Sequence, residues 1–213
     1  GANVIYGDAG ADTIKSYKTA AAASDEIHGG AGNDYIEAEK GDDTLYGDDG
    51  DDSVYGGNDD DILYGGNDDD FLSGESGADT LYGGAGDDTV AGGSGDDLLY
   101  GGGGDNWLSG GGGADTFIFE DATAYDTPDE ISNFRDSESD AIDLSDLLSE
   151  YDPLTEVITD FVEITNNGSA SYTLAVDSDG GADNFVDIID FTNANGLSED
   201  EAALESSGIL ITS

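Results

Sequence analysis

Aspartate recurs every nine residues through much of the first half of this 213-residue chain. The regular column consists of Asp34, Asp43, Asp52, Asp61, Asp70, Asp79, Asp88, Asp97, Asn106 and Asp115, and Asp12 and Asp25 fit it in looser rows upstream. Carboxylates that a fold stacks closely repel one another unless a cation lies between them. The spacing therefore predicts a row of cation sites whose ligands are oxygen atoms.

A large apolar residue stands two positions after each aspartate of the regular column. These residues are Ile36, Leu45, Val54, Leu63, Leu72, Leu81, Val90, Leu99, Leu108 and Phe117. The first six residues of each row are rich in glycine and predict a sharp turn, because glycine adopts left-handed conformations without steric cost. The last three predict a short strand whose middle side chain points inward. Successive rows then stack into parallel sheets and form a solenoid.

Ten consecutive rows, residues 29–118, keep this register without an insertion. The rows before residue 29 are looser, although Asn3, Asp12 and Asp25 fit the aspartate column. Residues 16–24 take nine positions where five are expected. We therefore expect residues 16–24 to form an irregular loop that bulges from the stack.

The row pattern Gly-Gly-x-Gly-x-Asp-x-U-x, in which U is a large apolar residue, resembles the calcium-binding RTX (repeats-in-toxin) repeat. The resemblance covers residues 1–118. It implies a mainly β fold, a parallel β-roll solenoid of nonapeptide repeats with two rows per turn. Rows would then alternate between two edges of the roll, with stacked aspartates about 4.8 Å apart, one strand spacing.

Calcium suits the gap between such aspartates because it binds oxygen and accepts six to eight ligands at about 2.3–2.6 Å. The resemblance implies that one loop gives the carbonyls of its second and fourth residues and its sixth-position aspartate. The next loop on that edge would give the carbonyls of its first and third residues and its own aspartate. Gly30, Gly32 and Asp34 would thus share an ion with Gly47, Asp49 and Asp52.

Equivalent positions recur in the other rows. The remaining ligand positions implied, besides the aspartate column and Asn106, are Gly41, Gly50, Gly57, Asp59, Gly66, Asp68, Gly77, Gly84, Gly86, Gly93 and Gly95. Six rows on each edge leave five gaps, so we expect about ten calcium ions. If the aspartates were solvated turn residues instead, ten rows in strict register would have no explanation.

Four rows depart from the pattern and are expected to bind less tightly. Asn106 is neutral where the other rows carry a carboxylate. Asp59 and Asp68 replace the fourth-position glycine, and aspartate fits a left-handed geometry less well than glycine. The row that begins at Ala38 lacks the first pair of glycines.

Tyrosine recurs every eighteen residues at the ninth row position, as Tyr46, Tyr64, Tyr82 and Tyr100, with His28 ahead of them. In a roll with two rows per turn these side chains form one ladder on one face. Such a ladder packs across strands and stabilises the sheet. The alternative is a surface that binds carbohydrate rings.

The nine-residue period stops after Phe119, and residues 119–213 predict a small α+β cap. Residues 141–151 have helical spacing, residues 161–165 and 172–176 predict a hairpin, residues 185–191 predict a further strand, and a terminal strand ends the chain. Ser198 and Glu201 form a capping box for a short helix. Residues 129–148 with the terminal strand resemble the target region of type I secretion, which implies an uncleaved export signal read by an ABC-transporter channel.

Composition narrows the function further. The formal net charge of −47 excludes nucleic acid and insertion into a membrane as expected partners. Cysteine is absent, and neither a signal peptide nor an apolar run long enough for a membrane span is present. The sequence shows no catalytic set, so we expect no enzymatic activity from these residues.

These observations predict a secreted or cell-surface calcium-dependent folding and export module at the C-terminal end of a larger chain, most simply an adhesin. The chain would be disordered in a low-calcium cytosol and would fold outside the cell. A carbohydrate-binding module that uses the tyrosine ladder, or an accessory module of a secreted enzyme, are the alternatives.

Overall fold

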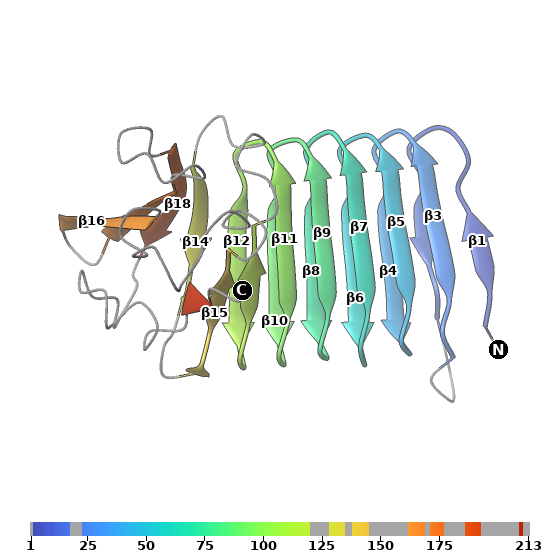
Figure 1. Ribbon diagram of the computed structural model, residues 1–213. Coiled ribbons are helices and arrows are strands. Elements are labelled where there is room, and N and C mark those ends of the chain that lie inside the picture. The colour runs from blue at the N-terminus through green and yellow to red at the C-terminus, as the bar shows by residue number, and fades with distance from the viewer. Residues whose placement is uncertain are drawn as a thin grey trace.

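Two β-sheets face each other and form a roll along which the chain advances turn by turn (Figure 1). The computed structural model describes residues 2–17, 23–119, 128–134, 138–144, 162–168, 171–176, 186–192 and 209–210. The fold is mainly β, as the row pattern predicts, and within these ranges no helix is long and apolar enough to cross a membrane.

The odd-numbered strands from β1 to β15, together with β19, form the first sheet. In spatial order they are β1 (Val4–Tyr6), β3 (Glu26–Ala31), β5 (Thr44–Asp49), β7 (Ile62–Asn67), β9 (Thr80–Ala85), β11 (Leu98–Gly103), β13 (Thr116–Ile118), β15 (Ala141–Asp143) and β19 (Ile209–Leu210). All pairs in this sheet are parallel.

The second sheet contains the even-numbered strands together with a hairpin at its C-terminal end. In spatial order they are β2 (Thr13–Lys15), β4 (Tyr35–Lys40), β6 (Ser53–Asn58), β8 (Phe71–Ser76), β10 (Thr89–Ser94), β12 (Trp107–Gly112), β14 (Asp129–Ser132), β18 (Val186–Thr192), β17 (Ser171–Val176) and β16 (Val162–Gly168). Only the pairs β16–β17 and β17–β18 are antiparallel among these described strands.

The pairing register confirms two rows per turn. Leu45 pairs with Leu63 and Leu63 with Leu81, so each turn advances by eighteen residues. The strands run six residues rather than the expected three, because the first turn residues also pair, as Gly66 does with Gly84. The pair Val4–Glu26 is separated by twenty-two residues, four more than a regular turn. This matches the predicted insertion, of which residues 18–22 lie outside the described ranges.

The core is a double column of single side chains, one from each row. From Ile27 to Leu108 every inward apolar residue is fully buried, and Phe117 and Ile131 continue the columns. Near the last regular turns, Phe134 packs against Phe117 with ring centroids 6.2 Å apart. One aliphatic side chain per nine residues is a thin core, so burial alone offsets little of the conformational entropy lost on folding.

The C-terminal strands agree with the sequence in part. The predicted hairpin corresponds to β16 and β17, the next predicted strand to β18, and the terminal strand to β19. The predicted helix over residues 141–151 is wrong at its start, because Ala141–Asp143 forms β15 and pairs with β13. Residues 145–151, and the helix expected near Ser198, lie outside the described residues.

Candidate metal centre

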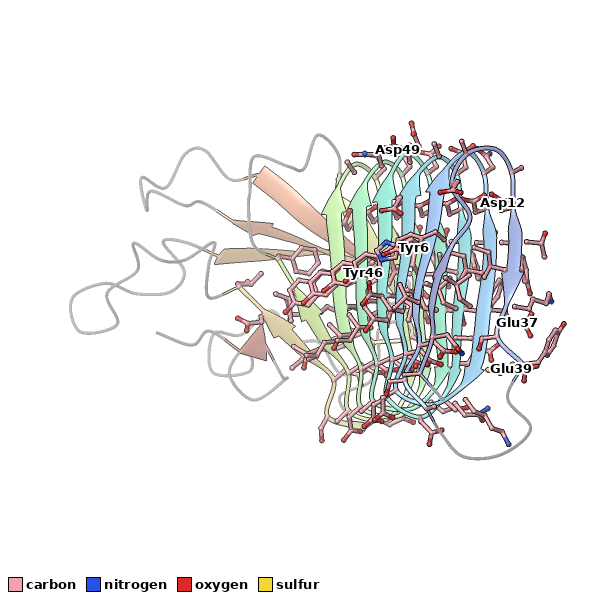
Figure 2. The ribbon with its side chains drawn as sticks, turned by 90° about the vertical axis from the view of Figure 1, so that its right-hand side faces the viewer. Tyr6, Asp12, Glu37, Glu39, Tyr46 and Asp49 are labelled. Carbon is pink, nitrogen blue, oxygen red and sulfur yellow. The ribbon has the colours of Figure 1, made fainter. Side chains whose placement is uncertain are left out.

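The turns of the roll place the aspartates in two columns, one along each edge. The first edge, formed by the turns that follow the first sheet, carries Asp12, Asp34, Asp52, Asp70, Asp88 and Asn106; the second edge carries Asp25, Asp43, Asp61, Asp79, Asp97 and Asp115. Figure 2 shows Asp12 and Asp49 on the first edge and Glu39 on the opposite one. From Asp25 to Asp115 every column residue is at most 3% exposed.

One carboxylate oxygen of each column aspartate is held by the backbone of the turn before it. The Asp52 N–H donates to Asp70 Oδ1 at 2.8 Å on the first edge, and the Asp61 N–H donates to Asp79 Oδ1 at 2.7 Å on the second. The same hydrogen bond links every neighbouring pair in both columns. The backbone therefore fixes each side chain in the interior of its edge.

In most column members the second side-chain atom makes no hydrogen bond. Among the described residues twelve buried side-chain atoms are in this position: Oδ2 of Asp12, Asp34, Asp43, Asp52, Asp61, Asp70, Asp79, Asp88, Asp97, Asp115 and Asp129, and Nδ2 of Asn106. Buried polar atoms without partners are rare and costly. Their restriction to these columns indicates that a ligand belongs there.

Backbone carbonyls point into the same gaps. Asp34 Oδ2 and the carbonyl oxygen of Gly47, in the next turn on the same edge, converge on one place beside Gly29. A Cβ atom added to Gly29 would lie 2.5 Å from the first oxygen and 2.7 Å from the second. We call the earlier of two stacked turns on an edge the turn below and the later one the turn above. In the turn below, the carbonyl oxygens of Gly66 and Asp68 point toward Gly84 and Gly86 of the turn above.

From the turn above, the third-position carbonyl points down, as Gly103 O does when it accepts the Gly86 N–H at 3.0 Å. The oxygens of the first and third positions above, of the second and fourth positions below, and of both aspartates thus face one gap. This is the oxygen set implied by the resemblance.

Left-handed backbone at the second and fourth turn positions directs these carbonyls. Gly84 and Gly86 have φ of 123° and 138°, and the same two positions are left-handed in every turn from residue 29 to residue 115. Asp59 and Asp68 adopt this conformation with φ of 77° and 75°. The two departures noted in the sequence therefore keep the turn geometry, at the steric cost of a side chain in that region.

Burial raises the pKa of seven of the column aspartates. The pKa is raised to about 8 for Asp61, to about 7 for Asp70, Asp88 and Asp97, and to about 6 for Asp52, Asp79 and Asp115. Loss of solvation is the largest cause, and neighbouring carboxylates add to it, while the backbone N–H from the previous turn acts in the opposite direction. Without a counter-ion, burial disfavours the ionised form of these groups.

The donor set fits calcium. No group of three or more His, Cys, Asp or Glu side chains gathers within the described ranges, since each gap combines only two aspartates with backbone carbonyls. Calcium accepts carbonyl and carboxylate oxygen together in a flexible shell of six to eight ligands. The residues present would hold it, and it would supply the positive charge that the buried carboxylates lack.

Two of the irregular rows keep the column geometry. Asn106 Oδ1 accepts the Asp88 N–H at 2.9 Å, as an aspartate would, but its Nδ2 lies in the next gap. Ala38 is fully buried at the first turn position, where other rows have glycine. A Cβ at the same position of the neighbouring rows, at Gly29 or Gly47, would lie 2.5 or 2.4 Å from the Oδ2 atom of that row's column aspartate.

Four residues at the ends of the columns lie outside the ligand set predicted from the sequence. Asp129 Oδ1 accepts the Asn106 N–H at 2.9 Å, and Asp140 Oδ1 accepts the Asp115 N–H at 3.2 Å, so both columns extend by one member. The signal was Asp-x-Ile, present at residues 129–131 and 140–142 without the glycines. At the other end, the Asn3 N–H donates to Asp25 Oδ1 and the Ser16 hydroxyl donates to Asp25 Oδ2.

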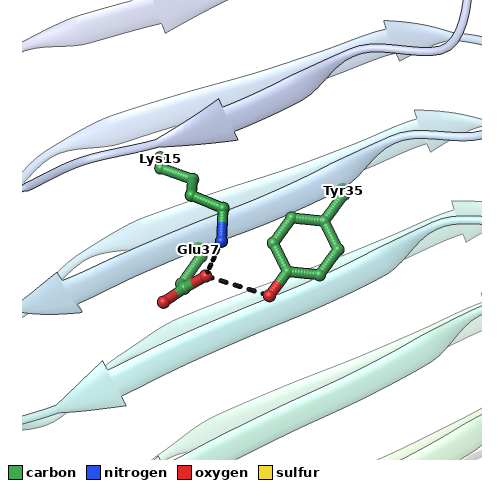
Figure 3. A network of polar contacts seen from close by, with 3 residues as sticks. All are labelled: Lys15, Tyr35 and Glu37. Atoms are coloured by element: carbon green, nitrogen blue, oxygen red, sulfur yellow. Dashed lines mark hydrogen bonds and ion pairs between the residues drawn. The ribbon is translucent and has the colours of Figure 1, made fainter.

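One ion pair lies on the outward face of the second sheet, away from the gaps (Figure 3). Lys15 Nζ is 2.5 Å from Glu37 Oε2, and the Tyr35 hydroxyl donates to the same oxygen at 2.9 Å. These two hydrogen bonds lower the pKa of Glu37. Lys15 is thus paired with Glu37 and does not supply the positive charge for the aspartate columns.

The tyrosine ladder is a continuous stack of rings on the first sheet. Centroids of successive rings from Tyr6 through His28, Tyr46, Tyr64 and Tyr82 to Tyr100 are 4.4–4.9 Å apart, and their planes differ by 3–20°. Tyr6 and Tyr46 are visible on this face in Figure 2. Inner rings cover each other's faces and leave their edges outward, which favours the packing role.

Comparisons with known proteins place this geometry in context. No curated protein matches the chain. Two solved structures from the mannuronan C5-epimerase of Azotobacter vinelandii are similar to it. Its AlgE6R3 subunit is 27% identical, with 72% of this chain and 78% of that chain covered and a TM-score of 0.31. The AlgE6R2 subunit of the same epimerase is 23% identical, with 70% of this chain and 88% of that chain covered and a TM-score of 0.31.

The family model described as the RTX calcium-binding nonapeptide repeat (4 copies) matches residues 1–16, 19–54, 46–81, 55–90 and 82–117. These matches span more than half of the chain and contain both columns from Asp12 to Asp115. The repeat, the parallel roll and the paired oxygen-lined gaps agree, and the chain therefore belongs to the family of RTX calcium-binding repeat proteins.

Proposed function

We propose that this chain is a calcium-driven folding and export module at the C-terminal end of a larger secreted protein. The observation that carries the proposal is the set of buried column atoms without hydrogen-bond partners, with backbone carbonyl oxygens converging on several of them. Calcium would satisfy these atoms, and its binding free energy would then be folding free energy.

The calcium-free roll has little to hold it together. Its core is one aliphatic side chain per row, and its edges bury carboxylates whose raised pKa values record a cost of about 1.4 kcal/mol per pKa unit when they ionise. At neutral pH these costs, repeated along both edges, keep the calcium-free chain unfolded, and its net charge of −47 keeps it extended. Such a chain can be threaded through a transporter channel.

Calcium outside the cell would make the folded roll more stable than the unfolded chain. Extracellular calcium-binding modules typically have dissociation constants of about 10⁻⁴–10⁻³ M, so they are empty in the cytosol and filled outside. Filling five gaps on each edge would take about ten ions and add about +20 of charge.

RTX repeat proteins are typically exported, which supports a secreted or cell-surface location. The C-terminal residues would carry the export signal for the type I transporter, and the parent chain would be an adhesin.

Circular dichroism during a calcium titration tests the proposal. We expect a disordered spectrum in chelator and a cooperative change to a β spectrum as calcium rises, reversed when chelator is added again. Magnesium at equal concentration is the control, because it demands a tighter octahedral shell and keeps its waters. A β spectrum that persists unchanged in chelator would contradict calcium-driven folding.

Export needs its own measurement. The full chain, co-expressed with a type I transporter, is expected in the medium, whereas the same chain without residues 145–213 is expected to stay in the cell. Equal export of both would contradict the signal while leaving calcium binding intact.

A further inference from the structure

The two columns do not end with the nonapeptide repeats. Asp129 and Asp140 lie beyond residue 117, where the family match ends, and each accepts the backbone N–H of the last repeat member on its edge. Asp129 is fully buried and Asp140 is 1% exposed. Each edge therefore has one further gap, at the junction between the repeats and the strands β14 and β15.

The orientation of the side chains assigns each unpartnered atom to a gap. Asp34 Oδ2 converges with the carbonyl of Gly47, which belongs to the next turn, so Oδ2 faces the gap above its own turn. By the same geometry Asp115 Oδ2 faces the gap to Asp140, and Asn106 Nδ2 faces the gap to Asp129.

The gap above Asp115 is a carboxylate gap. Asp115 Oδ2 is buried without a hydrogen-bond partner in a side chain that is 1% exposed. The charges of Asp140, Asp96 and Glu138 act on the same carboxyl group and, after burial, raise its pKa. Below this gap Gly111 and Gly113 have the left-handed φ of 103° and 131° that turns carbonyls upward in the other repeats. A cation is the group that this set of oxygens lacks.

The gap above Asn106 is chemically different. A Cβ placed on Gly101 would lie 2.9 Å from Asn106 Nδ2 and 2.9 Å from Asp129 Oδ2, so the amide nitrogen and the carboxylate oxygen converge on one point. In the turn before, the corresponding neighbours of Gly83 are Asp88 Oδ2 and the carbonyl of Gly101. Burial raises the pKa of Asp129 to about 7, while the backbone N–H of Asn106 and its side-chain amide act to lower that pKa. An N–H donor thus stands where the other gaps present oxygen.

We propose that calcium binds between Asp115 and Asp140, outside the nonapeptide repeats, whereas on the other edge the Asn106 amide takes the place of the ion beside Asp129. The junction site joins the last repeat to β15, so calcium ties the following strands to the roll on one edge only. This inference rests on calcium binding by the roll as proposed above.

Counting bound calcium by native mass spectrometry at fixed free calcium tests both halves of the proposal. Asp140→Asn keeps an oxygen acceptor for the Asp115 N–H and is expected to bind one ion fewer than the unaltered chain. Asp143→Asn, on the same strand β15, is the matched control and should bind the full number. Thermal unfolding in calcium gives the second readout, with a lower midpoint expected for Asp140→Asn only.

The gain of a site is the sharper test, because it removes nothing from the fold. Asn106→Asp is expected to bind one ion more, and adding Asp129→Asn to it is expected to abolish that gain. Full loading of Asp140→Asn, or no gain in Asn106→Asp, would overturn the junction proposal while the repeats still bind calcium. An unaltered chain that binds no calcium would overturn the proposed function as well.

Discussion

Each column aspartate belongs to two turns. One oxygen accepts the N–H of the turn before, as Asp79 Oδ1 does from Asp61, and the other faces the turn after. The side chain is therefore positioned by the backbone before any ion arrives, and the ion meets ligands that are already oriented. Such preorganisation lowers the cost of binding at each gap.

Replacing one column carboxylate tests this view at the residue scale. In Asp61→Asn the amide oxygen still accepts the Asp43 N–H, now 2.7 Å from Asp61 Oδ1, but an NH₂ group replaces the unpartnered oxygen. We expect one or two fewer bound ions and a thermal midpoint in calcium lower by about 4 °C or more, since each kcal/mol lost is worth about 2–4 °C in a chain of this size.

The matched control is Asp60→Asn. Asp60 is exposed at the neighbouring turn position, where its Oδ1 accepts the Ala78 N–H at 2.9 Å, and asparagine retains that acceptor. Calcium loading of this variant should match the unaltered chain. Equal losses in the two variants would mean that overall charge, rather than the buried column, governs binding.

At the scale of the element, each row combines a strand that packs and a turn that binds. The outward ladder from Tyr6 to Tyr100 joins the strands of the first sheet through ring stacking that is independent of the edges. The roll thus has two kinds of contact between turns, aromatic on a face and ionic along the edges.

Removing one ring distinguishes the contribution of the aromatic contacts from that of the ionic contacts. Tyr64 stacks on Tyr46 at 4.9 Å and on Tyr82 at 4.8 Å, so Tyr64→Ala loses two ring contacts worth about 0.5–1.5 kcal/mol each. We expect lower stability in urea at saturating calcium with an unchanged number of bound ions, whereas Tyr64→Phe keeps the stack and stays close to the unaltered chain. Loss of ions in Tyr64→Ala, or undiminished stability, would argue against a separate packing role.

The nine-residue period predicted the repeating elements well, because every row presents the same alternation of one inward large apolar residue and outward neighbours. The prediction failed where one residue pattern is compatible with both a helix and a strand. Ile142 and the leucines after it have helical spacing, yet Ala141–Asp143 is a strand because β13 offers it an edge to pair with. Asp129 and Asp140 escaped prediction because the residues before them lack the glycines of the repeat, and the Ser16 contact with Asp25 depends on an insertion whose path the sequence does not specify.

At the scale of the whole molecule, protons and calcium compete for the same carboxylates. In the calcium-free roll the folded-state pKa of seven column aspartates is raised to about 6–8, above the ordinary value of about 3.9 in an unfolded chain. Their contribution to stability is fully present below about pH 4 and is lost as the pH rises through 6–8. The calcium-free chain should therefore be more ordered at pH 5 than at pH 8.

Calcium reverses the dependence, because it binds the ionised carboxylates and releases protons. We expect the calcium concentration at half-folding to be about tenfold higher or more at pH 5.5 than at pH 8. Circular dichroism titrations across this range measure it, and calorimetry in buffers of different ionisation enthalpy counts the protons released. A half-folding concentration that does not change with pH would show that the aspartates are already ionised before calcium binds.

The register of eighteen residues per turn also governs how such a chain can change in length. Gaining or losing a whole turn leaves every downstream row on its original sheet, so the ring stack and both acidic edges stay continuous. Gaining or losing a single row would move every later tyrosine to the opposite face and interrupt the stack at that point. Duplication in pairs of rows is therefore the step by which this architecture can lengthen without being rebuilt.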